Sequence, residues 1–282
     1  MHIPDGYVNL PVSLAGAAVA AAGVTMAARR AAIAVREKVT TLPAVVSAYL
    51  LVAQLLVVPV GFGTSAHLIG TGLATVLVGP AVAMVCVATV VVLQALVFAD
   101  GGVTAIGLNV IDDGLVPALV TAVGVRLVWP LVGRSRERFA AVAGISAALG
   151  ALAGGFAAAG VLVLGGTDVV SHATIVAALG GAHVVVAGVE AVLTVGIVAT
   201  VLRLRPDLVA MARPARTGRP VGPVPDVAGV SEEAADEAAA VAGTAAAPCV
   251  EPAAQRESDL PASIGRRRVG RGREPGRGPV RS

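Results

Sequence analysis

The sequence predicts an all-α membrane protein: a polytopic bundle of about seven transmembrane helices, with the N-terminus outside and the C-terminus in the cytoplasm. Apolar residues (AVILMFWYC) make up 56% of the 282 residues and charged residues only 14%, whereas an ordinary soluble domain carries about 25% charge. Several apolar runs reach the roughly 20 residues that a helix needs to cross about 30 Å of hydrocarbon. These observations exclude a single soluble domain and indicate a multi-pass protein of the cell (plasma) membrane.

The seven expected spans are rich in Ala, Val, Leu and Gly, and they cover residues 10–28, 41–60, 67–80, 81–98, 107–132, 139–165 and 173–202. The third and fourth come from one apolar block of 32 residues, 67–98, which is too long for one upright helix at about 1.5 Å per residue. Gly79-Pro80 lies inside this block. Because Pro removes a helix donor and disfavours helical backbone in the residue before it, the block is divided there.

The placement of charge gives the same division and sets the orientation. Lys and Arg collect at residues 29–38, at 134–138 and from 203 onward, and cytoplasmic loops are the ones that collect them. With seven spans all three clusters fall in the cytoplasm, whereas with six the first two lie on opposite sides. The acidic residues at or near the outer side are then Asp5, Asp100, Asp112, Asp113 and Asp168. For Asp112 and Asp113, helix capping or solvation is favoured over the attraction of cations.

The third expected helix, residues 67–80, has 14 residues and a length of about 21 Å, too short to cross from surface to surface. We expect its outer end to start inside the membrane, with residues 61–66 dipping inward and ending at His67 in a pocket. Such irregular backbone is tolerated only where protein lines a cavity. The alternative is a helix lengthened at its start by residues 64–66.

The two ends of the chain differ from the apolar middle. Secretory signals place positive charges before the apolar run, whereas Arg29 and Arg30 follow the first run, so the N-terminal segment is expected to stay on the protein. From residue 206 the composition changes to Ala, Gly, Pro, Glu and Arg, which buries too little apolar surface to offset the ordering entropy. We therefore expect a membrane domain over 1–205 and a disordered cytoplasmic tail over 206–282, whose Arg-rich end contacts lipid or solvent rather than nucleic acid.

Ionisable groups in so apolar a domain are candidates for function, and the chain has four His residues: His2, His67, His172 and His183. His2 can take part in a specific metal chelate. The terminal amine of Met1, the deprotonated amide nitrogen of His2 and its Nδ1 can hold one metal ion with three nitrogens in a plane. One more imidazole completes a square-planar site of four nitrogens, typical of Ni(II) or Cu(II). His67, on the expected pocket loop, is the candidate fourth donor.

A second group of candidates lies in the last expected span. His183 and Glu190 are seven residues apart, nearly two helical turns, so they share one face. Two interpretations stay open. They are a hydrogen-bonded polar pair that fixes helix packing, or they belong to the path of an ion.

Several short motifs then match a known family. They are Met1-His2-Ile3-Pro4-Asp5-Gly6-Tyr7, Ser65-Ala66-His67-Leu68-Ile69-Gly70, Val78-Gly79-Pro80, Gln94-Ala95-Leu96-Val97-Phe98-Ala99-Asp100-Gly101-Gly102, Ile106-Gly107-Leu108-Asn109 and the stretch from His183 to Glu190. In these motifs the sequence resembles the CbiM/NikM family, the substrate-binding components of energy-coupling factor (ECF) transporters for cobalt and nickel. The resemblance covers residues 1 to about 208.

The resemblance implies a seven-helix substrate-binding (S) component whose N-terminal loop tucks into the bundle. It implies that the Met1 amine, His2 and His67 bind Co(II) or Ni(II), the transported substrate, with Ser65 and Asn109 as candidates for orienting these ligands through hydrogen bonds. The implied partners are a transmembrane coupling (T) component, a pair of cytoplasmic ATPases and, often, a small accessory membrane subunit; the imported metal would serve cobalamin biosynthesis. One departure is Asp112-Asp113, where members often have Asn-Met.

The expected function is therefore non-enzymatic capture of a divalent transition-metal ion for an ATP-driven importer. The sequence has no Gly-x-x-x-x-Gly-Lys-Ser/Thr nucleotide loop, so ATP hydrolysis is expected in a partner. The first alternative is a secondary metal transporter coupled to protons through His183 and Glu190. The second is a membrane metalloenzyme, disfavoured because no carboxylate is adjacent in sequence to the expected His2 and His67 site. The choice between cobalt and nickel stays open.

Overall fold

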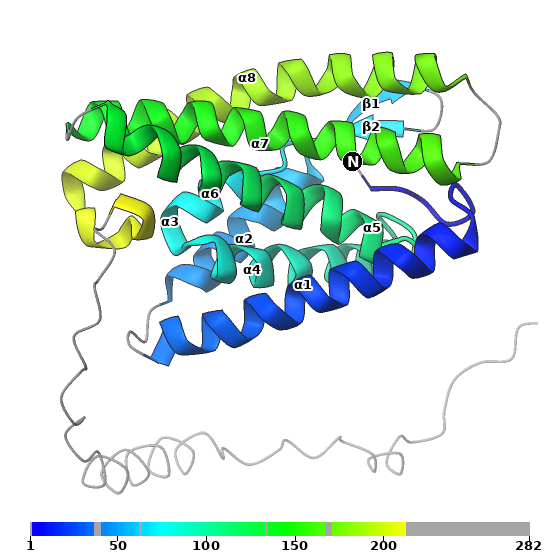
Figure 1. The fold of residues 1–282 in the computed structure, drawn as a ribbon, viewed down its shortest axis with the longest axis horizontal. Coiled ribbons are helices and arrows are strands. Elements are labelled where there is room, and N and C mark those ends of the chain that lie inside the picture. Colours follow the sequence, from blue (N-terminus) through cyan, green and yellow to red (C-terminus); the bar gives the residue numbers. More distant parts are fainter. Residues whose placement is uncertain (1, 37–40, 62–63, 133–134, 167–170, 213–282) are drawn as a thin grey trace, which may run out of the picture. The chain divides into compact units, whose positions relative to one another are not determined.

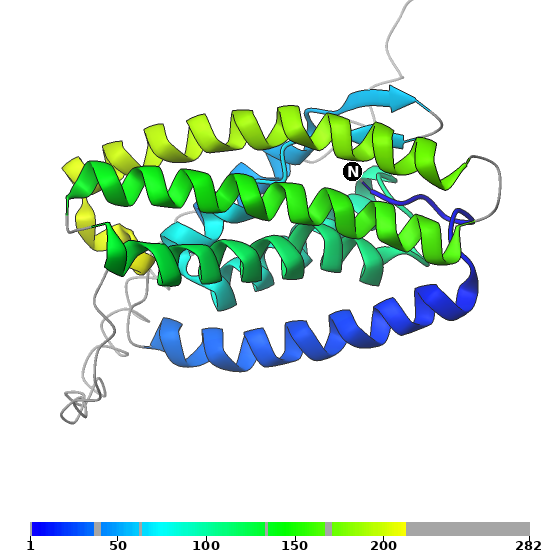
Figure 2. The same cartoon turned by 45° about the horizontal axis from the view of Figure 1, so that its top comes forward.

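The computed structural model describes residues 2–36, 41–61, 64–132, 135–166 and 171–212, and these belong to one compact unit, Met1–Thr217. This unit is a bundle of long helices with one short β-hairpin at its side (Figures 1 and 2). Its described elements are α1 (Leu10–Arg36), α2 (Leu42–Leu55), β1 (Val58–Gly61), β2 (Thr64–Ala66), α3 (Thr71–Val78), α4 (Pro80–Leu93), η1 (Gln94–Phe98), α5 (Ile106–Val110), η2 (Ile111–Leu115), α6 (Val116–Val128), η3 (Trp129–Leu131), α7 (Arg136–Gly165), α8 (His172–Leu204), η4 (Pro206–Leu208) and η5 (Ala210–Ala212). The protein is thus mostly helical, as predicted, and the hairpin is an addition that the all-α prediction did not contain.

Helices long enough to cross a membrane make up most of the bundle. Each of the seven expected ranges contains a helix. Among the described residues, five stretches are both long and apolar enough to span: Leu10–Ile33, Pro80–Phe98, Ile106–Leu131, Arg136–Gly165 and His172–Leu204. The helices α2, with 14 residues, and α3, with 8, are shorter. Many large apolar side chains on the long helices face outward, as expected of a surface that lipid covers.

The apolar block 67–98 is broken where the sequence predicts. Helix α3 ends at Gly79, which has a φ of 85°, and Pro80 occupies the first turn of α4. A positive φ suits glycine, and proline tolerates the first turn because its missing N–H has no helical partner there. The prediction of two helices is confirmed.

The third helix begins at Thr71, four residues later than the predicted start at residue 67. Residues 64–66 form β2, which pairs antiparallel with β1, so the alternative of a helix lengthened through these residues is wrong. The part of this connection that enters the bundle is the turn of residues 66–70, in which Ala66, His67 and Ile69 are almost fully buried. His67 therefore lies on irregular backbone inside the protein, as predicted.

The N-terminal segment folds back onto the bundle. Val8 forms a β-bridge with Gly166, and the Asn9 N–H donates to the Gly165 carbonyl at 2.8 Å. Ile3 is buried in an apolar cluster with Leu108 and Leu179, among others. In Figures 1 and 2 the N-terminal end lies beside α7 rather than projecting from the bundle.

Close packing of α7 against α8 depends on glycine. A Cβ at Gly155 would lie 2.3 Å from His183 Cγ, and one at Gly144 would lie 2.8 Å from the Ala191 carbonyl oxygen. Small residues allow such close approach of helices in membranes. The two helices begin at capping serines, Ser135 and Ser171, whose hydroxyls accept backbone N–H groups three residues on.

The residues that directly follow the predicted domain boundary at residue 205 pack against the bundle. Residues 206–212 form the two short turns η4 and η5, and Val209 between them is fully buried in the main apolar cluster. This apolar contact explains why these seven residues fold with the bundle although their composition resembles the tail. The rest of the predicted tail, residues 213–282, lies outside the described residues.

Candidate metal centre

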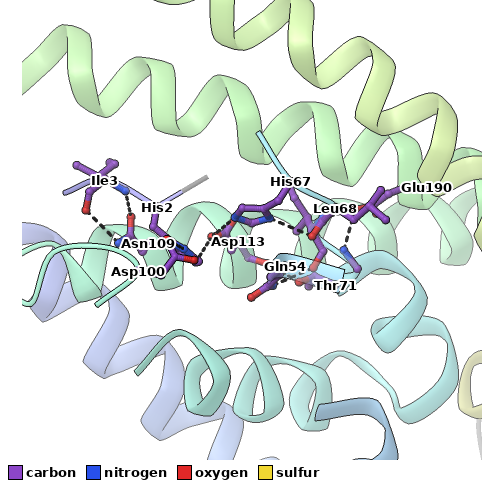
Figure 3. A network of polar contacts seen from close by, with 12 residues as sticks. His2, Ile3, Gln54, His67, Leu68, Thr71, Asp100, Asn109, Asp113 and Glu190 are labelled. Atoms are coloured by element: carbon purple, nitrogen blue, oxygen red, sulfur yellow. Dashed lines mark hydrogen bonds and ion pairs between the residues drawn. The ribbon is translucent and has the colours of Figure 1, made fainter. Parts of the chain in front are cut away.

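Three side chains from distant parts of the chain meet inside the bundle: His2 from the N-terminal segment, His67 from the turn before α3, and Asp113 from η2 (Figure 3). One donor atom from each lies within 4.8 Å of the others. His2 Nε2 is 3.3 Å and His67 Nε2 is 4.0 Å from Asp113 Oδ2, and the exposed fractions of the three side chains are 1%, 1% and 0%. Two imidazoles and a carboxylate in a buried cluster form a donor set suited to a divalent transition metal.

His67 is oriented by its own turn. Its Nδ1 lies 3.0 Å from the Leu68 carbonyl oxygen, and since a carbonyl only accepts, Nδ1 carries the proton. The Nε2 atom therefore presents a lone pair, and it has no hydrogen-bond partner among the described residues. This is the arrangement that a metal-binding imidazole needs, with one nitrogen fixed as donor and the other free.

His2 lies between two carboxylates. Its Nδ1 is 3.3 Å from Asp100 Oδ1, and its Nε2 faces Asp113. Burial opposes the charged imidazole, but the interactions with Asp100 and Asp113 outweigh burial and raise the pKa of His2 to about 9. The same contact with His2 lowers the pKa of Asp100. In the absence of metal, His2 is thus an imidazolium at neutral pH, and a chelate through Nδ1 requires that nitrogen to leave Asp100.

The N-terminal segment is held next to His2 by backbone hydrogen bonds. The Ile3 N–H donates to Asn109 Oδ1 at 2.8 Å, while Asn109 Nδ2 and the Gly102 N–H donate to the Ile3 carbonyl at 3.3 and 2.9 Å. The Asp5 carboxylate accepts from Val103 N, Thr104 N and Thr104 Oγ1 at 3.1, 2.8 and 2.5 Å. The hydroxyl and amide of Thr104 lower the pKa of Asp5. Asn109 was expected to orient a metal-bound His, but it holds the backbone next to His2 instead.

The turn that carries His67 is held from the opposite side. Glu190 Oε1 accepts from the N–H groups of Ile69 and Gly70 at 2.5 and 2.7 Å, and Gln54 Nε2 donates to the Ile69 carbonyl at 3.0 Å. All of these groups are buried. Glu190 from α8 is therefore a structural anchor of the turn that presents His67.

Of the two interpretations of His183 and Glu190, the hydrogen-bonded pair is wrong. His183 Nδ1 contacts the Leu179 carbonyl at 2.7 Å, one turn earlier in its own helix, and Glu190 binds the turn before α3. The two residues do share a face and are both buried. His183 Nε2 has no hydrogen-bond partner among the described residues.

Of the other predicted site residues, Ser65 lies in β2 paired with Pro59, and no side-chain hydrogen bond of Ser65 occurs among the described residues. Met1, the expected source of the terminal amine, lies outside the described residues. The loop residue Asp168 also lies outside them. His172 begins α8 and is exposed.

The expectation that Asp112 and Asp113 cap a helix or face solvent is wrong, because both are fully buried and neither carboxylate has a hydrogen-bond partner among the described residues. They lie in η2, a π-helical segment between α5 and α6, and such segments recur at functional sites. The sequence did hold a signal: two acidic residues inside an apolar span are costly and mark function by default. The sequence-based argument against a metalloenzyme also fails, since Asp100 and Asp113 bring carboxylates to His2.

Comparison with known proteins agrees with this geometry. A family model, CbiM, described as "Cobalt uptake substrate-specific transmembrane region", matches residues 2–208. The chain is 33% identical over 212 residues to a putative metal transport protein of Haloquadratum walsbyi, covering 74% of this chain and 93% of that protein. It is also 33% identical over 216 residues to a putative fused nickel transport protein of Archaeoglobus fulgidus, covering 74% and 68% respectively.

Two solved structures resemble the fold. A transition metal transporter is 27% identical with a TM-score of 0.67, over 72% of this chain and 93% of that one. A truncated transition metal transporter is 28% identical with a TM-score of 0.64, over 72% and 99%.

Proposed function

This chain belongs to the CbiM family of cobalt-uptake transmembrane regions, a family of multi-pass membrane transport proteins, and from that premise we propose that it is the substrate-binding subunit of an ATP-driven cobalt or nickel importer. It captures one divalent ion at the outer face of the membrane. The observation that carries the proposal is the meeting of His2 and His67, whose donor atoms converge with Asp113 in a buried cluster. The terminal amine of Met1 adds a further nitrogen donor.

The position of this cluster fits capture from outside. We propose seven membrane-crossing or membrane-embedded helices with the N-terminus outside and the C-terminus in the cytoplasm. Figure 1 supports this orientation, because the end of α1, the start of α7 and the end of α8 lie together at one end of the bundle. These are the helix ends nearest the three basic clusters, and basic clusters favour the cytoplasm.

The partners follow from the same proposal. ATP hydrolysis falls to a pair of cytoplasmic ATPases, and a transmembrane coupling component, often with a small accessory subunit, transmits the motion that releases the ion inward. The alternative, a proton-coupled secondary transporter, uses His183 and Glu190 and needs no ATPase.

Metal binding to the purified protein in detergent tests the function directly. We expect isothermal titration with Co(II) or Ni(II) to give one ion per chain. His67→Ala removes one ligand, so it should weaken binding by more than the about 10- to 100-fold that removal of a partner of a metal ligand costs. A variant with one extra Gly before Met1 keeps every side chain but turns the amine into an amide, and it should weaken binding to a similar extent.

The matched control is His172→Ala, which removes an exposed imidazole at the start of α8 and should bind like the wild type. Absence of binding by the wild-type protein would contradict the proposed function. Full binding by the extended variant would contradict only the role of the Met1 amine.

Metal affinity should also depend on pH with a definite sign. Each bound ion must displace the proton of His2, whose pKa is about 9 in the metal-free protein. Below that pH the apparent affinity should rise by at least about tenfold per pH unit, because metal binding releases the proton. Titrations between pH 6 and 9 measure the slope, because they cover the range from about three units below the pKa of His2 up to that pKa. A slope that falls by about tenfold per pH unit above pH 6.5, the ordinary His value, would show that the two carboxylates do not hold the proton on His2, because one proton fewer is then released on binding.

A further inference from the structure

One feature of the cluster is unexplained by two histidines alone: its buried polar atoms face one another without hydrogen bonds. His67 Nε2 and Asp113 Oδ1 have no hydrogen-bond partner among the described residues, and Asp113 Oδ2 has only ion-pair contacts, the shorter with His2 Nε2 at 3.3 Å. Buried polar groups normally find partners, and an unsatisfied one costs roughly 1–3 kcal/mol. A group of them in one place therefore indicates that something else satisfies them.

The pair formed by His67 and Asp113 identifies what is missing. His67 Nε2 carries a lone pair, because the proton is on Nδ1 against the Leu68 carbonyl. Asp113 Oδ2, 4.0 Å away, is also an acceptor when ionised. Two acceptors that face each other with no proton between them repel, and a cation between them turns the repulsion into two bonds.

The spacing is that of ligands sharing one ion. Two donor atoms each bound at about 2.1 Å are about 3.0 Å apart at a right angle, about 3.4 Å at a tetrahedral angle and at most about 4.2 Å. Asp113 Oδ2 lies 4.0 Å from His67 Nε2, inside this range, and 3.3 Å from His2 Nε2, the ring nitrogen that a chelate through Nδ1 leaves free. The same distances are longer than the 2.7–3.2 Å typical of hydrogen bonds between N–H and O.

The need to compensate the charge of a buried ion also points to Asp113. The three side chains are 1%, 1% and 0% exposed, and an ion in such a place is costly unless an opposite charge compensates it. Imidazoles supply no negative charge, whereas Asp113 does. Its backbone carbonyl separately accepts a hydrogen bond from the Thr71 hydroxyl, so the position of η2 does not depend on the carboxylate.

We propose that the Asp113 carboxylate is a direct ligand of the transported ion, and that it makes this a mixed nitrogen and oxygen site that weakens the preference for Ni(II) over Co(II) of an all-nitrogen plane. The inference rests on the proposed function. Nitrogen donors in one plane suit Ni(II), whereas an added oxygen breaks the plane and suits ions that accept other geometries. Asp113 thus determines metal specificity.

The test uses the full-length protein in detergent, with Co(II) and Ni(II) as the probes, and it measures affinity together with the electronic spectrum and magnetism of the bound ion. In the wild type, bound Ni(II) should be paramagnetic, as a non-planar site requires. In Asp113→Asn, bound Ni(II) should become diamagnetic and planar, and Co(II) binding should weaken about 10- to 100-fold, shifting the preference toward nickel. Asp113→Glu, which keeps a carboxylate, should stay paramagnetic with Ni(II).

Asp112→Asn is the matched control. It removes the neighbouring, equally buried carboxylate, which is outside the three-residue cluster, so its metal spectra should match the wild type. Diamagnetic Ni(II) in the wild type would overturn the inference. So would weaker binding by Asp113→Asn with an unchanged spectrum, because Asp113 would then only orient His2. Either result leaves the proposed function standing, which fails only if the wild type binds neither metal.

Discussion

Replacing Gly102 by alanine should abolish high-affinity metal binding, because the N-terminal segment can no longer dock. A Cβ at Gly102 would lie 2.4 Å from the Asp5 nitrogen and 2.7 Å from the Pro4 carbonyl carbon. These are backbone atoms, so the contact cannot be relieved by turning a side chain. The Gly102 N–H also donates to the Ile3 carbonyl, and displacement of the segment breaks this bond. Since the displaced segment carries His2 and, in the proposed function, the Met1 amine, we expect a loss greater than the about 10- to 100-fold that removal of a partner of a metal ligand costs.

The measurement is titration of the purified variant with Co(II), alongside a thermal melt. The melt should change little, because the clash lies in the segment that covers the bundle rather than between its long helices. Gly160→Ala is the matched control, since a Cβ there meets no atom within 4 Å among the described residues. Wild-type affinity in Gly102→Ala would show that capture does not require the docked segment.

Much of the fold could be predicted because it follows from apolar length and from proline. The break at Gly79-Pro80 depends on local backbone chemistry and was found at the correct residue. The hairpin was missed because β1 lies at the end of the apolar run of residues 41–60, where Pro59 argues against a continued helix but does not by itself predict a strand. The late start of α3 was missed for the same reason, since the apolar residues Leu68 and Ile69 continue the apolar pattern of the helix.

The site was predictable only in part, for a different reason. Unusual chemistry at the chain's start pointed to His2, and the expected pocket loop together with the motif resemblance pointed to His67. Asp113 was assigned to helix capping or solvation because its burial depends on a π-helical segment. Nothing in the sequence predicts that segment. The partner of Glu190 is 120 residues away in the chain, and a shared helix face cannot reveal a contact with another element.

Glu190→Ala should cause the second large effect, a loss of both stability and metal affinity. Glu190 Oε1 accepts the N–H groups of Ile69 and Gly70, and alanine leaves both donors buried without a partner. At roughly 1–3 kcal/mol for each unsatisfied group, the cost is about 2–6 kcal/mol. Because the two unsatisfied donors lie in the turn that carries His67, we expect a lower melting temperature and at least about tenfold weaker Co(II) binding.

Glu190→Gln separates the anchoring role of this residue from a role in moving protons. The amide oxygen of glutamine can accept the same two N–H groups, so the turn and metal binding should be retained, while the titratable carboxyl is lost. An importer driven by ATP should then still transport metal when its coupling and ATPase partners are present. A transporter coupled to protons through Glu190 should bind metal but fail to move it, and its wild-type activity should persist without an ATPase and disappear with a protonophore. Uptake by vesicles containing Glu190→Gln, measured with and without the partners, therefore decides between the two transport mechanisms with one substitution.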